Sequence, residues 1–197
     1  MDWAQRYAEK NTPWDNGEAH PDLRERFADL DLPRGGRALV PGCGRGHDAL
    51  FLAQQGLNVL AVDLVEGLAD EVGARFEKLG SRFLVADALT LEIDEPFDLV
   101  FEQTFYCAID PEQRPAWAAL QARALKPGGK LAVLVFPIDR PKDLGGPPWQ
   151  TRSEDLQAVL GENFRLLVEE PARHPLEKRE WREGWSVFER VEGSASC

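Results

Sequence analysis

The sequence predicts an α/β fold, with a mostly parallel sheet covered by helices on both faces. Three observations support this prediction. Short apolar runs alternate along the chain with amphipathic segments of helical period. Glycine and proline punctuate many of the junctions between them. The run from Leu131 to Phe136 is almost entirely apolar, as in a central strand that is buried on both faces. Strands that alternate with helices in this way imply right-handed crossovers and parallel pairing.

The first 32 residues precede the alternating pattern. Residues 3–19 are rich in aromatic and turn-forming side chains, which predicts a helical turn followed by a loop at 12–17. Pro21 suits the first turn of a helix that carries Leu23, Phe27 and Leu30 on one face. Pro33 and the two glycines after it end this helix.

From residue 38 onward, strands and helices alternate. Asp110, Pro111 and Gln113 have the N-cap, N1 and N3 pattern that starts a helix, and the run at 126–129 stops it. The charged connection at 171–184 has no clear apolar stripe, which predicts a solvated connection over 173–183 and an antiparallel last strand. We expect strands at 38–40, 57–62, 83–85, 97–101, 131–136, about 163–168 and about 185–191, and further helices at 47–55, 66–78 and 153–160.

Composition excludes several functional classes. The 197 residues carry a formal net charge of −11, which argues against binding to nucleic acid or to anionic lipid. The chain has no run of about 18 apolar residues that could span a membrane and no apolar leader. Its three cysteines are too few and too scattered for a disulfide framework or a zinc site. We expect one cytoplasmic domain without a metal, of a size that can stand alone as a monomer.

A glycine-rich loop follows the first predicted strand. The loop runs from Val40 to Asp48 and places Gly42, Gly44 and a further glycine in the spacing G-x-G-x-G. Glycine lets a backbone approach a ligand closely, although the same glycines could simply make a tight strand-to-helix turn. The second strand ends in Asp63, where an acid can accept hydrogen bonds from ribose hydroxyls. The third ends near Asp87 and Ala88, close to the expected position of an adenine ring.

Two nucleotide cofactors fit this frame. A dinucleotide prefers G-x-G-x-x-G, but His47 stands at the third glycine position, and the loop has no Walker lysine. S-adenosylmethionine has no pyrophosphate to bind, so the shorter glycine pattern suits it better. The sequence therefore favours S-adenosylmethionine and leaves a nicotinamide-dependent oxidoreductase as the alternative.

Several blocks of the sequence resemble the thiopurine and thiol/halide methyltransferases. The resemblance covers roughly residues 3–165 and is closer to the thiol/halide branch. The matching blocks are Trp3, Arg6-Tyr7, Thr12-Pro13-Trp14-Asp15, Ala38 to Gly46, Phe97 to Ile109, Arg114 to Trp117, Phe136-Pro137 and Gly145 to Trp149. The resemblance implies a seven-stranded class I methyltransferase fold, Rossmann-like, that uses S-adenosylmethionine and releases S-adenosylhomocysteine.

The resemblance also implies roles for particular residues. Gly42 falls on the contact to the methionine moiety, Asp63 on the ribose acid, and Asp87 with Ala88 on the adenine contact. Gly44 belongs to the same loop, and residues 1–32 are expected to cover the site. Trp3 and Trp14 match family tryptophans, and Tyr7 stands where the family usually has another. We expect these three side chains to form a flap over the cofactor that excludes water.

The acceptor side has two departures from the family pattern. Gln103 follows the fourth strand, where these families usually have Tyr or Arg, and Phe136 replaces a Tyr common in the plant-type enzymes. We expect Gln103, Phe136 and Trp149 to line the methyl-transfer site, with Gln103 also close to the cofactor. Soft nucleophiles such as thiolates or iodide need no dedicated general base, and no histidine stands at a predicted acceptor-side strand end. The predicted activity is methyl transfer to a small thiol, thiopurine, bisulfide or halide; a cofactor-binding module without turnover stays open.

Overall fold

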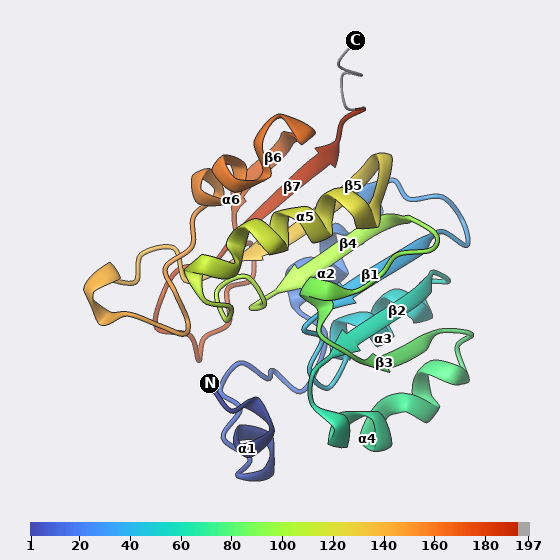
Figure 1. The fold of residues 1–197 in the computed structure, drawn as a ribbon, viewed down its shortest axis with the longest axis horizontal. Helices are drawn as coiled ribbons and strands as arrows, with labels where there is room; N and C mark the ends of the chain where they lie inside the picture. Colours follow the sequence, from blue (N-terminus) through green and yellow to red (C-terminus); the bar gives the residue numbers. More distant parts are fainter. Residues whose placement is uncertain (193–197) are drawn as a thin grey trace.

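The computed structural model describes residues 1–192 and contains one seven-stranded sheet between two layers of helices (Figure 1). The strands lie in the order β3-β2-β1-β4-β5-β7-β6, and only β7 runs antiparallel to its neighbours. Their bounds are β1 Arg37–Pro41, β2 Asn58–Asp63, β3 Arg82–Val85, β4 Phe97–Gln103, β5 Leu125–Val135, β6 Phe164–Pro171 and β7 Gly184–Arg190. The predicted fold class, including the antiparallel last strand, is confirmed.

The helices fall where apolar side chains recur at helical spacing. Their bounds are α1 Trp3–Ala8, α2 Pro21–Arg26, α3 His47–Gln54, α4 Glu66–Glu77, α5 Arg114–Ala124 and α6 Ser153–Leu160. Short 3-10 turns adjoin several of them, at Phe27–Leu30, Ala88–Thr90, Pro111–Gln113, Lys142–Leu144 and Gly161–Asn163. Within the described residues, none of these helices is long and apolar enough to cross a membrane.

Two hydrophobic layers lie on opposite faces of the sheet because successive strand side chains alternate. In β1, Ala38 and Val40 pack with α2, α3 and α4, whereas Leu39 packs with α5 and α6. Phe76 of α4 and Trp117 of α5 are fully buried in the two layers. This double coverage leaves the carboxyl ends of β1, β2 and β4 as the edge where a ligand can reach the sheet.

Three local expectations need correction. The helix expected from Pro21 is α-helical only to Arg26 and then tightens into a 3-10 turn. The residues at 126–129, expected only to end the helix, belong to β5, which begins at Leu125. Leu125 pairs with Phe97 of β4, and the register between the two strands shifts after this pair. The charged connection before β7 is only partly solvated. It buries the side chains of Arg179 and Glu183 to 5% and 0% exposure, since each pairs with the other.

Candidate active site

The loop after β1 turns sharply at three glycines. Gly42, Gly44 and Gly46 have φ angles of +60°, +54° and +70°, in the left-handed region that side chains disfavour. Gly46 is also the N-cap of α3. At each of the three positions, the backbone therefore adopts a positive φ angle that favours glycine.

Each of these glycines also faces an aromatic ring of the protein. A Cβ on Gly42 would lie 2.5 Å from the Phe105 ring, and one on Gly46 would lie 2.8 Å from Phe76. A Cβ on Gly44 would lie 2.6 Å from the Tyr7 hydroxyl. The space beside the loop is shared between aromatic side chains from α1, α4 and the turn after β4.

Two acids lie where the sequence places them, at the ends of β2 and β3. Asp63 accepts hydrogen bonds from the backbone N–H groups of Gly44 (2.8 Å) and Val65 (3.1 Å), and burial raises the pKa of its carboxyl. Asp87 is exposed and caps the turn that follows, accepting from the Leu89 N–H at 2.9 Å. Asp63 is thus tied to the glycine loop, while Asp87 points to solvent with one oxygen bonded.

Trp3, Tyr7 and Trp14 form one aromatic cluster, as the sequence predicts. The ring of Trp14 stands edge-on to Trp3 at 5.3 Å and to Tyr7 at 5.8 Å between centroids. The Trp14 indole N–H donates to the Tyr7 hydroxyl at 3.2 Å. Burial raises the pKa of Tyr7, so its hydroxyl stays protonated. Through the Tyr7 hydroxyl, the cluster reaches the space beside Gly44.

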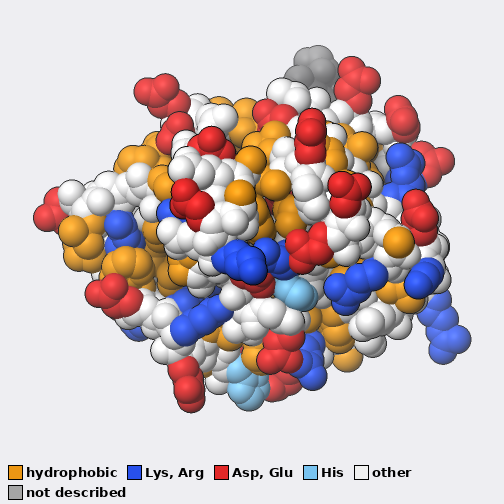
Figure 2. All heavy atoms as spheres, turned by 90° about the horizontal axis from the view of Figure 1, so that it is seen from below, with side chains coloured by type: hydrophobic (Ala, Val, Ile, Leu, Met, Phe, Trp, Pro, Cys, Tyr) orange, Lys and Arg blue, Asp and Glu red, His pale blue; other side chains and the backbone are white. Residues whose placement is uncertain are grey.

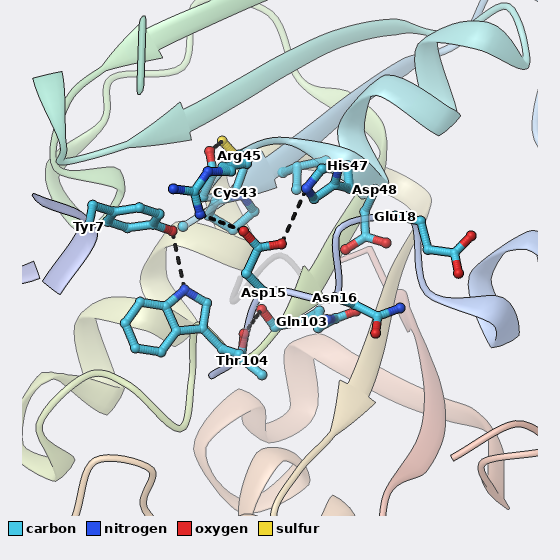
Figure 3. A pocket seen from close by; sticks show the side chains of 15 residues that line it. Tyr7, Asp15, Asn16, Glu18, Cys43, Arg45, His47, Asp48, Gln103 and Thr104 are labelled. Atoms are coloured by element: carbon cyan, nitrogen blue, oxygen red, sulfur yellow. Dashed lines mark hydrogen bonds and ion pairs between the residues drawn. The ribbon is translucent and has the colours of Figure 1, made fainter. Parts of the chain in front are cut away.

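Asp15 fastens this segment to the glycine loop (Figure 3). Its carboxylate pairs with Arg45 at 2.6 Å and with His47 at 3.2 Å, and it accepts from the Gly17 N–H at 2.8 Å. The hydrogen bond with His47 is the main reason that its pKa lies well below the usual range. On the other side, the Lys178 ammonium donates to the Asp15 carbonyl. We call residues 3–17 the roof.

A cavity of about 50 Å³ lies between the roof and the glycine loop. Its walls include Tyr7, Trp14, Gly42, Gly44 and Gln103. This volume holds only one or two water molecules, whereas sites for nucleoside-sized ligands measure roughly 300 Å³ or more. The roof therefore fills much of the space over the glycine loop in this structure.

The three expected acceptor-side residues occupy different surroundings. Gln103 lines the cavity, but Phe136 and Trp149 do not. Phe136 is 9% exposed, and its ring faces the Arg179 guanidinium at 4.5 Å. Trp149 packs on Gly146, and its backbone N–H donates to the Cys107 carbonyl at 2.8 Å. With the Gln103 amide turned so that its oxygen faces Arg179 Nη2 at 3.2 Å, Arg179 lies between Gln103 and Phe136.

Sequence reasoning missed three buried groups at this end of the sheet. Asp48 at the start of α3 accepts from the His20 N–H at 2.8 Å, and burial raises the pKa of its carboxyl. Glu102 accepts from the Phe105 and Tyr106 N–H groups, at 2.8 and 2.7 Å. Arg179 is the third. Asp48 follows the glycine loop and Glu102 lies near the end of β4, so their positions in the sequence could have marked them as site residues. Arg179 lies in a charged run, where no local pattern distinguishes it from its neighbours.

The surface around the site is mixed in charge. Figure 2, which views the molecule from below the orientation of Figure 1, shows Lys and Arg side chains across the middle of this face with Asp and Glu between them. Among residues 1–192, no His, Cys, Asp and Glu side chains gather as they would around a metal ion.

Comparisons with known proteins identify the family. The thiopurine S-methyltransferase (TPMT) family matches residues 1–194. Thiocyanate methyltransferase 1 of Arabidopsis thaliana is 36% identical over 197 residues, covering 96% of this chain and 84% of that protein. A probable thiol methyltransferase 2 of the same plant is 38% identical over 162 residues, covering 80% and 70%.

A more distant relative is also named for thiopurine methylation, and a solved structure shares the fold. A thiopurine S-methyltransferase of Legionella pneumophila (strain Corby) is 28% identical over 171 residues, covering 78% of this chain and 77% of that protein. The structure of Burkholderia thailandensis 1,6-didemethyltoxoflavin-N1-methyltransferase, which holds S-adenosylhomocysteine, has a TM-score of 0.75 at 22% identity, covering 97% and 86% of the two chains. The family match decides against a nicotinamide cofactor: this chain belongs to the thiopurine S-methyltransferase family and is an S-adenosylmethionine-dependent methyltransferase.

Proposed function

We propose that this enzyme methylates a small, soft anion: a thiolate, bisulfide, thiocyanate or halide. The observation that carries the proposal is the buried Arg179 guanidinium between Gln103 and the Phe136 ring. Glu183 neutralises this charge through Nη1, and the Nη2 group that faces Gln103 is the donor that we propose for an acceptor arriving as an anion.

The residues at the ends of β1 to β3 fit S-adenosylmethionine. Asp63 has lone pairs left for ribose hydroxyls after its two backbone bonds, and Asp87 with Ala88 suits the adenine edge. The glycine loop would receive the methionine moiety. When bound, the cofactor supplies a methyl group activated by a sulfonium.

The chain itself has two tasks in this reaction. The aromatic cluster of Trp3, Tyr7 and Trp14 would close over the glycine loop, exclude water and face the sulfonium with its rings. Gln103 and Arg179 would hold the anion in line with the methyl group, because alignment is the main requirement of such a displacement. Trp149 is proposed as an outer wall of the acceptor side.

The relatives support the choice of acceptor. This chain is 36–38% identical to plant proteins named for thiol or thiocyanate methylation, and 28% identical to thiopurine enzymes of Legionella pneumophila. The net charge of −11 argues against a nucleic-acid acceptor. We further propose that the enzyme acts in the cytoplasm as a monomer.

A product assay tests the proposal. The purified protein is mixed with S-adenosylmethionine and, separately, iodide, bisulfide, thiocyanate, aliphatic and aromatic thiols, and a thiopurine; methylated products are measured by gas chromatography with mass spectrometry. We expect turnover of at least one anionic acceptor, and at least tenfold less product with Asp63→Ala. A protein that binds S-adenosylhomocysteine but methylates none of these acceptors would instead be a cofactor-binding module.

A further inference from the structure

Five buried or half-buried polar residues form a closed ring of contacts at the acceptor side of the cavity. They come from four separate parts of the chain, because Arg179 and Glu183 belong to the same connection. Its members are His20 before α2, Asp48 of α3, Gln103 at the end of β4, Arg179 of the connection and Glu183 before β7. Gln103 and Asp48 line the cavity, so the ring borders the site itself.

The contacts can be followed around the ring. The His20 backbone N–H donates to Asp48 Oδ1 at 2.8 Å. With its amide nitrogen turned to Asp48, Gln103 donates to Asp48 Oδ2 at 3.3 Å and accepts from Arg179 Nη2 at 3.2 Å. Arg179 Nη1 donates to Glu183 Oε1, which also lies 3.4 Å from His20 Nε2. The ring therefore returns to the residue where it began.

Glu183 is the member that fixes Arg179. Its side chain has 0% exposure, and its second oxygen accepts from the Leu176 N–H at 2.6 Å, so the carboxylate has one orientation. His20 Nδ1 accepts from the Asp22 N–H at 3.2 Å, which leaves the proton on Nε2, facing Glu183. The Leu176 hydrogen bond and the nearby His20 ring thus set where this carboxylate, and with it the guanidinium, can lie.

We propose that Glu183 and His20 are positioning residues that hold the Arg179 guanidinium against Phe136 and Gln103, where the acceptor anion is recognised. This inference rests on the proposed function. A free arginine side chain samples many rotamers, and ordering it when the acceptor binds costs free energy. A guanidinium fixed in advance through Nη1 keeps Nη2 directed at Gln103 and lets the anion bind without that cost.

The test replaces Glu183 with its neutral isostere. We expect Glu183→Gln to lower kcat/KM for the best anionic acceptor at least tenfold, while the dissociation constant for S-adenosylhomocysteine, measured by calorimetry, changes less than twofold. Because Glu183 acts through Arg179, the double variant Glu183→Gln/Arg179→Gln should lose no more activity than Arg179→Gln alone. A structural role only would make the two losses additive.

A buried ion pair nearby gives a matched control. Asp22 and Arg26 pair at 3.1 Å with exposures of 0% and 3%, and Asp22 also binds the connection through the Arg173 and His174 N–H groups. None of these side-chain contacts reaches Gln103 or Phe136, and the substitution keeps the Asp22 backbone N–H that donates to His20. Asp22→Asn should lower the melting temperature at least as much as Glu183→Gln but keep kcat/KM within twofold. An equal loss of kcat/KM in both variants overturns the proposal.

A binding measurement separates this inference from the proposed function. Thiocyanate is titrated into the parent and into Glu183→Gln, both saturated with S-adenosylhomocysteine. Weaker thiocyanate binding by the variant supports the positioning role even where the parent turns over no acceptor. Equal binding and equal turnover in parent and variant overturn the role while the proposed function stands. A parent that neither binds thiocyanate nor turns over any acceptor overturns both.

Discussion

Asp15 shows how one carboxylate can decide whether a site is closed. It bridges Arg45 of the glycine loop and His47, the first residue of α3, from a loop that is otherwise held by aromatic contacts and Lys178. Its side chain is 14% exposed, so these pairs are less screened than surface ion pairs. Asp15 therefore links the roof to both the glycine loop and the start of α3.

Removing the charge of Asp15 should weaken cofactor binding. We expect Asp15→Asn to raise the dissociation constant for S-adenosylhomocysteine about tenfold, because two charge-assisted hydrogen bonds that close the roof are weakened by roughly 1–2 kcal/mol in total. Calorimetry measures the affinity. The control is Asp29→Asn, the same change at an exposed position of the turn after α2. Equal affinities of the two variants would show that Asp15 does not close the site.

Glu102 makes the stability depend on pH. Burial raises the pKa of its carboxyl to about 7, above its ordinary value in an unfolded chain. The folded state therefore binds the proton more tightly, so this contribution is complete at acidic pH and is lost as the pH rises through 7. Glu102→Gln keeps an oxygen for the two N–H donors but cannot titrate.

We expect the unfolding free energy of the parent, relative to Glu102→Gln, to fall between about pH 5 and pH 8. The slope is at most about 1.4 kcal/mol per pH unit, the value for one proton. Urea unfolding at pH 5, 6, 7 and 8 measures it. Parallel curves for the two proteins would mean that Glu102 keeps an ordinary pKa.

At the scale of the element, the glycine loop is under two separate constraints, backbone angle and space. Gly46 has a φ of +70° and faces the fully buried ring of Phe76, whereas Gly56 has a φ of +88° and open space around it. Gly46→Ala should destabilise the fold by about 2–4 kcal/mol, and Gly56→Ala by only about 1 kcal/mol. Chemical denaturation of both variants tests this difference, and equal losses would show that only the backbone angle matters.

Local sequence patterns predict the elements of this protein but not the contacts between distant parts of the chain. The order of strands and helices, the loop at 40–48 and the acids Asp63 and Asp87 could be predicted, because apolar period and turn residues act locally. The aromatic cluster of Trp3 and Trp14 could be predicted only from the family resemblance. The partners of Arg179 and Glu183 could not, because nothing local in a charged connection says which side chains the fold will bury.

At the scale of the whole molecule, the candidate site is assembled from both ends of the described chain. The roof comes from residues 3–17, and the acceptor side is completed by the connection before β7, which reaches back through Lys178 to Asp15 and through Glu183 to His20. The carboxyl ends of the parallel strands lie between the roof and the acceptor side. Figure 1 shows α1 and the connection below the carboxyl ends of the strands. Long-range contacts of this kind depend on the completed fold, which is why local sequence gave no sign of them.

The three glycine–ring pairs constrain how this enzyme could diverge. Phe105, Tyr7 and Phe76 lie far from the loop in the chain, yet each occupies the space that a side chain at Gly42, Gly44 or Gly46 would need. A larger residue can replace one of these glycines only after the aromatic residue facing it has been replaced by a smaller one. If the aromatic residue is replaced first, a cavity remains until the glycine is replaced as well. The pairs are therefore expected to be inherited together, and each first step toward a new pair passes through a less stable ancestor.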